Sequence, residues 1–373
     1  MSFKHYRICH SISSNVMKQI DFDPAVISTS LPAHALVKVM ERDRAISTLN
    51  IVAMLSVILI HLMPLYNLKE WVYYLNTGVP LFFLISGFLY GQKNISKWGS
   101  FYIKRWKTLM IPIYIGIVAT LIFLSPFRLT KYSFHQYLTH FLNLSGVTWM
   151  DASPNHDMYS LLTLNGRLEY IHDFLHLWFM TYLMIALFLI PLFQFIRNKF
   201  SPTKAWLGGW LPVAFASLIL LVLTFTGFNL WYIGTFMIGY CVNTNIIPRN
   251  WKGVRLSAIL VVGCYIVLYS IADYQTNFGN LFCASYIALQ SVIAVCMFGI
   301  TKFIFRAFPN IKGFDVGNLT YFLYITHFPC LIIFHRLLDY PLTALVLYSI
   351  ATLFTGFCLQ FINKFVQRVM RRN

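Results

Sequence analysis

The stretch that decides the fold class lies between residues 205 and 247 and reads AWLGGWLPVAFASLILLVLTFTGFNLWYIGTFMIGYCVNTNII. It contains no Asp, Glu, Lys or Arg, and it is about twice as long as the ~20 residues that one helix needs to cross a bilayer. This length and composition predict two membrane-spanning helices that form a hairpin. Two further charge-free runs, residues 46–66 and 341–363, are each long enough for one span.

The composition of the whole chain points to the same class. Of the 373 residues, 58% are hydrophobic and 11% are charged, whereas soluble domains carry about 25% charged residues. One soluble core could not bury this much apolar surface, because cores stop growing at roughly 250–300 residues. We therefore predict an all-α polytopic membrane protein with about ten transmembrane helices, at residues 46–66, 74–91, 108–126, 174–196, 206–225, 229–247, 256–272, 280–301, 317–334 and 342–363.

The distribution of basic residues predicts the orientation. With the N-terminus in the cytoplasm, the inner segments carry 24 of the 29 Lys and Arg residues and the outer loops carry 5, as the positive-inside rule requires. Both termini are then cytoplasmic, and the chain is a multi-pass protein of the cell (inner) membrane. The same residues account for the net charge of +17, so we expect membrane lipid as a partner and no nucleic acid.

Two segments lie outside the spans. Residues 1–43 form a polar N-terminal tail that is either disordered or upstream of the true start, for which Met40 is a candidate. Residues 44–373 form the membrane domain, with a long outer loop at about 126–173 that contains Trp149, Asp157 and Tyr159. Loops of this length are uncommon and often functional, so this loop is a candidate lid or acceptor site.

Few side chains inside the predicted spans can carry chemistry. No span contains a carboxylate, which disfavours an ion-coupled transporter, and the seven cysteines form no Cys-x-x-Cys pair, so no metal site is predicted. His61, His176 and His327 remain. His176 lies near the outer end of its span, where a hydrogen bond between helices is the favoured interpretation. His61 and His327 lie at estimated depths of roughly 20 and 15 Å from the inner face, with Ser86 at roughly 10 Å. Histidine is the natural general base near neutral pH. The alternative is that each histidine only forms a hydrogen bond between helices.

Four stretches together resemble the acyltransferase-3 family of integral-membrane O-acyltransferases. They are residues 49–61 (LNIVAMLSVILIH), 79–89 (VPLFFLISGFL), 104–112 (KRWKTLMIP) and 317–327 (GNLTYFLYITH), with a weaker match at 177–179 (LWF). The resemblance covers roughly residues 44–363, and the order and spacing of the motifs make it more specific than any one of them.

The resemblance implies transfer of an acyl group, usually acetyl, from an acyl-CoA to a sugar hydroxyl. The acceptor would be a cell-surface polysaccharide, such as the O-antigen of lipopolysaccharide, or its lipid-linked precursor. Acetyl-CoA or another acyl-CoA is then a substrate, and no bound cofactor is expected. The implied catalytic residues are His61, His327 and Asn50. The implied donor-binding residues are Lys104, Arg105, Lys107 and Ser86, and the acceptor-binding candidates are Trp178 and Asp157.

Asn50 departs from the family pattern, which usually has an arginine eleven positions before the first histidine. Asn can hydrogen-bond, but it cannot hold an anionic group by charge, so Arg44 or Arg105 substitutes, donor handling differs, or the protein is impaired. This leaves room for a competing function, a non-enzymatic exporter or flippase of lipid-linked saccharide. An enzyme should need His61, whereas an exporter should tolerate its removal. Trp178 also has two interpretations, an anchor at the membrane interface or a platform that stacks on a sugar.

Overall fold

A computed structural model describes residues 33–62, 76–91, 95–124, 141–142, 177–200, 231–241, 250–272, 275–311, 313, 319–335 and 341–372. The chain divides into two compact units, Met1–Asp43 and Arg44–Asn373. Helix α2 contains this boundary, because it begins at Ala33 and ends at Leu62. The candidate site residues all belong to the second unit.

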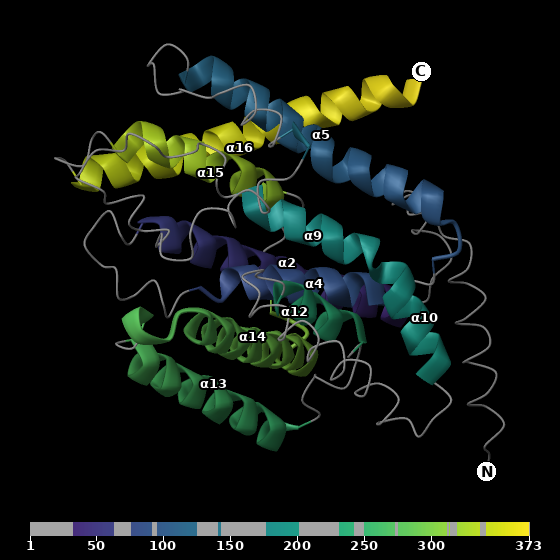
Figure 1. The fold of residues 1–373 in the computed structure, drawn as a ribbon. Coiled ribbons are helices and arrows are strands. Elements are labelled where there is room, and N and C mark those ends of the chain that lie inside the picture. Colours follow the sequence, from purple (N-terminus) through teal and green to yellow (C-terminus); the bar gives the residue numbers. More distant parts are fainter. Residues whose placement is uncertain are drawn as a thin grey trace. The chain divides into compact units, whose positions relative to one another are not determined.

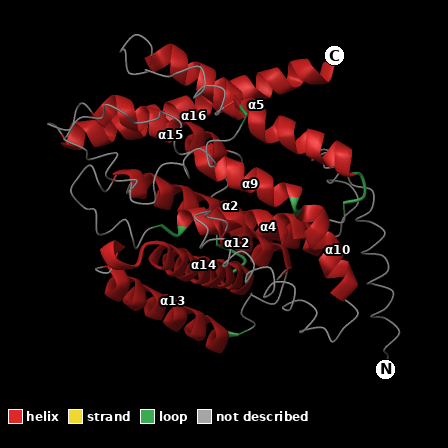
Figure 2. Cartoon of the chain, in the orientation of Figure 1, coloured by secondary structure: helices red, strands yellow, loops and turns green. Residues whose placement is uncertain are grey.

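The described residues form helices and contain no strand, which confirms the all-α prediction for this part of the chain (Figures 1 and 2). The helices are α2 (Ala33–Leu62), α4 (Gly78–Gly91), α5 (Trp98–Leu124), α9 (Trp178–Phe188), α10 (Ile190–Phe200), α12 (Trp231–Cys241), α13 (Trp251–Ala272), α14 (Gln275–Ala307), α15 (Leu319–His335) and α16 (Pro341–Arg372). Nine of the ten predicted spans overlap one of these helices. The span predicted at 206–225 lies outside the described residues.

Four helical stretches in the described part are long and apolar enough to cross a membrane. They are Arg44–Leu62, Trp251–Leu268, Ala288–Ala307 and Leu342–Met370, and the shorter helices α4 and α9 are also apolar. On α13 and α16, many large apolar side chains are exposed, among them Ile259, Ile266, Leu342 and Phe361. Such continuous apolar surface is stable against lipid and unstable against water. The chain is therefore a membrane protein, while the total of ten spans and their orientation remain predictions.

Helix α5 begins earlier than the predicted third span. The basic run at residues 104–107 was expected in an inner loop before a span starting at residue 108, but it lies inside α5. No Pro stands between Trp98 and the basic run, and Lys and Arg are good helix formers, so nothing ends the helix before the apolar part starts. The basic side chains are consequently fixed to one rigid element instead of a loop.

The fourth predicted span, residues 174–196, is interrupted in the structure. It is divided at Leu189 into α9 and α10, and the Leu189 amide donates to the carbonyl oxygens of Ile185 and Ala186 at 3.1 and 3.2 Å. Pro191 is the second residue of α10 and has no amide hydrogen to continue the ladder of α9. Proline is tolerated in the first turn of a helix, where the amide has no partner anyway.

Glycines bring α4 and α12 into close contact. A Cβ atom added to Gly87 would overlap the backbone of Phe236, and one added to Gly91 would overlap the backbone of Tyr240. In return, Gly239 of α12 lies against the backbone of α4. Small residues spaced four apart allow membrane helices to approach closely. Gly87, which belongs to the stretch at residues 79–89, therefore has a packing role, and its neighbour Ser86 is held at a fixed position on α4.

Candidate functional site

The two histidines singled out from the sequence meet in the structure. His61 lies in the last turn of α2 and His327 in the middle of α15, and the centroids of their rings are 5.3 Å apart with an angle of 34° between the planes. Both side chains are buried, with exposed fractions of 7% for His61 and 0% for His327. Two histidines from helices far apart in the sequence thus form one buried pair.

The backbone of α15 fixes the orientation of His327. Its Nδ1 atom lies 2.8 Å from the carbonyl oxygen of Tyr324 and 3.3 Å from that of Leu323. Because a carbonyl oxygen can only accept, Nδ1 carries the hydrogen and donates it, which assigns the tautomer of the neutral ring. The lone pair of the neutral ring is then on Nε2, the nitrogen that can receive a proton.

Aromatic side chains enclose the histidine pair. The ring of Phe328 stands edge-on to His61 at 5.1 Å between centroids, and Tyr324 lies 5.8 Å from His327. Tyr324 in turn contacts Phe179 of α9 at 5.4 Å. The Nδ1 atom of His61 is buried and has no hydrogen-bond partner among the described residues. A buried polar atom left without a partner is costly, so this nitrogen is a candidate contact point for a bound polar group.

Asn50 does not belong to the histidine pair. It lies eleven residues before His61 on the same helix, which corresponds to about three turns and a rise of ~16 Å. Eleven residues also return to the same face of a helix, so Asn50 and His61 are on one side of α2. Met54 and Val57, which lie between them on this side, are buried in the core, and Asn50 itself is half-buried. Asn50 is therefore at the far end of the face that presents His61.

Arg105 is held by two aromatic rings. Its guanidinium carbon lies 4.9 Å from the ring centroid of Tyr90, at the end of α4, and 5.8 Å from that of Phe101, one turn earlier on α5. The rings of Tyr90 and Phe101 also contact each other edge to face at 5.8 Å. Ser86 lies one turn before Tyr90 on α4 and is half-buried. We call Arg105, Tyr90 and Phe101 the arginine cradle.

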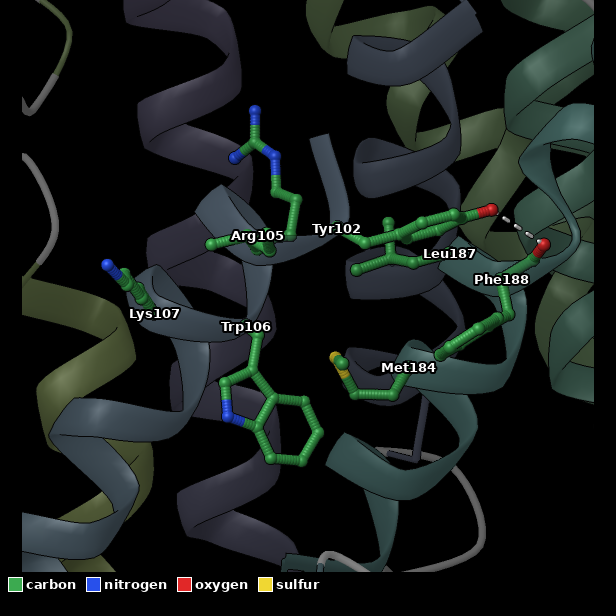
Figure 3. A pocket seen from close by; sticks show the side chains of 8 residues that line it. Tyr102, Arg105, Trp106, Lys107, Met184, Leu187 and Phe188 are labelled. Atoms are coloured by element: carbon green, nitrogen blue, oxygen red, sulfur yellow. Dashed lines mark hydrogen bonds between the residues drawn. The ribbon is translucent and has the colours of Figure 1, made fainter. Parts of the chain in front are cut away.

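The other two basic residues of the run are placed differently. Lys104 and Lys107 are exposed, whereas the Nε atom of Arg105 is buried and has no hydrogen-bond partner in the described part of the chain. In Figure 3 the guanidinium of Arg105 points away from the indole of Trp106. The structure therefore separates one inward cation from two outward ones, a distinction that the spacing of the run could not predict.

Of the two acceptor-binding candidates, the structure describes Trp178 but not Asp157. Trp178 is 9% exposed at the start of α9 and packs against Tyr232 and Tyr182, at 5.3 and 5.8 Å between ring centroids. It is buried among aromatic rings, so it is not an exposed anchor at the membrane interface. Its role in binding a sugar stays a prediction. Asp157 and most of the long loop at 126–173 lie outside the described residues.

Sequence reasoning missed two buried polar contacts that join α14 to its neighbours. The Thr77 hydroxyl donates to the Oε1 atom of Gln290, and the hydroxyls of Thr235 and Ser291 are 2.7 Å apart. All four residues are at most 5% exposed. Hydrogen bonds of this kind hold membrane helices together. Their sequence signal is an uncharged polar residue in the middle of an apolar run, which indicates a contact without showing the partner.

Lys302 is a further buried polar residue, one position beyond the span predicted at 280–301. It lies on α14, is 9% exposed, and its Nζ atom is 5.6 Å from the ring centroid of Phe88 on α4. The described residues contain no group of three or more His, Cys, Asp or Glu side chains that could hold a metal ion.

Comparison with known proteins bears on the family of the chain. A search of curated proteins and a search of solved structures find no match. The model of the acyltransferase-3 family, described as an acyltransferase domain, matches residues 43–361. This match contains the helices that carry both histidines, the arginine cradle and the α4–α12 contact, and it confirms the resemblance inferred from the four stretches. The chain therefore belongs to the acyltransferase-3 family of membrane acyltransferases.

Proposed function

We propose that this protein transfers an acyl group, most simply acetyl, from an acyl-CoA to a sugar hydroxyl of a cell-surface polysaccharide or its lipid-linked precursor. The observation that carries the proposal is the buried contact between His61 and His327, whose rings are 5.3 Å apart. Membership of the acyltransferase-3 family supports acyl transfer in general. The histidine pair supplies the acid–base group that transfer to a hydroxyl requires.

In the proposed reaction His61 acts as the general base. It takes the proton of the acceptor hydroxyl while the hydroxyl oxygen attacks the thioester carbonyl. The carbon–sulfur bond then breaks, an ester forms, and the proton passes to the thiolate of coenzyme A, so that atoms and charge balance. In a variant of this scheme the imidazole of His61 first carries the acyl group itself.

His327 orients and assists His61. Its ring is fixed by the bond from Nδ1–H to the Tyr324 carbonyl oxygen, so its Nε2 lone pair has a defined direction. A second neutral histidine close to the first can share the proton during the reaction. Burial of both rings excludes bulk water from the reacting atoms, which strengthens electrostatic interactions and limits hydrolysis of the donor.

Arg105 is the proposed anchor of the donor. Coenzyme A carries phosphates, and a guanidinium binds phosphate with two parallel hydrogen bonds. In the arginine cradle the guanidinium of Arg105 lies over the ring of Tyr90. This contact orients the N–H groups of the guanidinium before the donor binds. Asn50 and Ser86 are both half-buried, and we place the donor's arm along them, with the thioester at the histidines. Asn50 then offers a hydrogen bond where a charge is usual in the family.

The test compares surface polysaccharide from cells that carry the wild-type gene, His61→Ala or a deletion. Ester-linked acyl groups are measured by proton NMR before and after mild base, with membrane levels of each variant checked. We expect the base-labile signal to vanish in both altered strains while His61→Ala is still present in the membrane. An unchanged signal in all three strains, with less surface glycan only in the deletion, would replace the enzyme with an exporter of saccharide.

A further inference from the structure

A hollow lies between α5 and α9. It has a volume of about 240 Å³, and its walls include Tyr102, Ile103, Trp106, Met184, Leu187 and Phe188 (Figure 3). Ile103, Trp106 and Phe188 are 59%, 40% and 61% exposed. In a membrane protein such a face is turned to lipid.

The two helices are fastened to each other at this hollow. The Tyr102 hydroxyl donates to the carbonyl oxygen of Phe188 at 3.2 Å, and their rings stack at 4.9 Å with 16° between the planes. This contact is drawn as a dashed line in Figure 3. The wall of the hollow is thus held in place by a hydrogen bond and a ring stack, which gives it a defined shape.

Cations stand at the rim of the hollow. Lys107 and Arg105 are among its lining residues, and Lys104, three residues before Lys107 on α5, is exposed but does not line the hollow. Apolar side chains of α5 stand on both sides of these lysines, Ile103 before them and the apolar stretch from Leu109 after them, so the lysines lie near the level where the helix enters the hydrocarbon. That is the level of lipid headgroups, where lysines attract negative charge.

We propose that this hollow binds an anionic phospholipid, with an acyl chain between Trp106, Met184 and Phe188 and the phosphate at Lys107 and Lys104. Apolar walls fit hydrocarbon, whereas the base and ribose of a nucleotide need hydrogen-bond partners there. The cations complement a negative headgroup. The two lysines are thereby assigned to lipid. Arg105 also lines the hollow, but its guanidinium points away from Trp106 (Figure 3) and lies over Tyr90, so it is left for the donor.

Fluorescence quenching by brominated lipid tests the site in the full-length protein reconstituted in bilayers. The signal of Trp106 is the difference between wild type and Trp106→Phe. We expect phosphatidylglycerol with brominated chains to quench this signal more strongly than brominated phosphatidylcholine at the same mole fraction. The preference should fall about fivefold for each lysine removed, in Lys104→Gln and Lys107→Gln, and should weaken with salt.

Matched controls separate this site from general attraction to the membrane. Lys252→Gln removes an exposed lysine on α13 and should leave the preference of Trp106 unchanged. Equal quenching by both lipids, or an equal loss in Lys252→Gln, would overturn the proposal. Displacement of the lipid by free coenzyme A would also overturn it, because the hollow would then belong to the donor. Acyl transfer by the histidine variants is a separate measurement, and its loss does not affect the quenching of Trp106.

Discussion

Replacement of Gly87 by alanine should separate α4 from α12. A Cβ atom at this position would overlap the carbonyl oxygen of Phe236 and lie 2.9 Å from the amide nitrogen of Tyr240. These are backbone atoms of a helix, so they cannot rotate aside as the end of a flexible side chain can. The two helices must therefore move apart, and the contacts that they share are weakened along their length.

The expected cost follows from this geometry. Overpacking of a well-packed interface costs about 1–3 kcal/mol, and the better helix propensity of alanine offsets up to ~1 kcal/mol of it. Gly263→Ala in α13 is the matched control, because in the described part of the chain a Cβ atom there meets nothing within 4 Å beyond the backbone of its own helix and its chain neighbours. In Gly263→Ala only the better helix propensity of alanine acts. Gly87→Ala should therefore lower the free energy of unfolding, whereas Gly263→Ala should raise it.

Unfolding of the purified protein by a denaturing detergent in mixed micelles, followed by circular dichroism, measures both variants against wild type. We expect Gly87→Ala to unfold at a lower detergent fraction and Gly263→Ala at an equal or higher one. Equal stability of the two variants would show that α4 and α12 are not in close contact. The positions of Ser86 and Tyr90, which α4 carries, would then also be wrong.

Three further outcomes follow from the site. Tyr90→Leu removes a ring face from Arg105, a contact of about 0.5–2 kcal/mol. The KM for acyl-CoA should therefore rise by ~3–30-fold, while the KM of Tyr90→Phe stays near wild type. Equal KM values in the two variants would refute the arginine cradle. Thr77→Val and Gln290→Leu should each lower stability, with a coupling of about 0.6–1.7 kcal/mol in a double-mutant cycle; additive effects would exclude the hydrogen bond. Asn50→Arg should lower the KM for acyl-CoA by about tenfold, the value of one charge-assisted hydrogen bond, and an unchanged KM would place Asn50 away from the donor.

The helices were largely predictable because hydropathy marks where an apolar run begins. Their ends were less so. The basic run at residues 104–107 looked like a loop, yet it continues α5 since nothing in it stops a helix. The break at Leu189 depends on Pro191, a single residue inside an otherwise uniform apolar run. The span predicted at 206–225 and the loop with Asp157 lie outside the described residues, so those predictions stand as they were made.

The candidate site was predictable in its members and not in its contacts. An ionisable residue inside an apolar run is rare, and this selected His61 and His327 as candidates. Membrane helices are apolar on the sides that face lipid and on the sides that face one another, so no periodicity showed which helices are neighbours. For the same reason the partners of Gln290 and Arg105 came only from the structure. Arg105 and Lys107 point to different sides because both lie on the helix α5. The prediction of a loop at residues 104–107 could not show this.

The most direct test of the account measures acyl transfer by the purified protein in bilayers, as release of the coenzyme A thiol that depends on a glycan acceptor. His61→Ala, His327→Ala and the double variant are compared with wild type, with melting temperatures as a check on folding. We expect each single variant to lose about 10²–10⁴-fold in rate, and the double variant to lose little more, since residues that act as a unit are non-additive. Single variants that are folded and retain wild-type rates would contradict the central claim that the His61–His327 pair performs the chemistry.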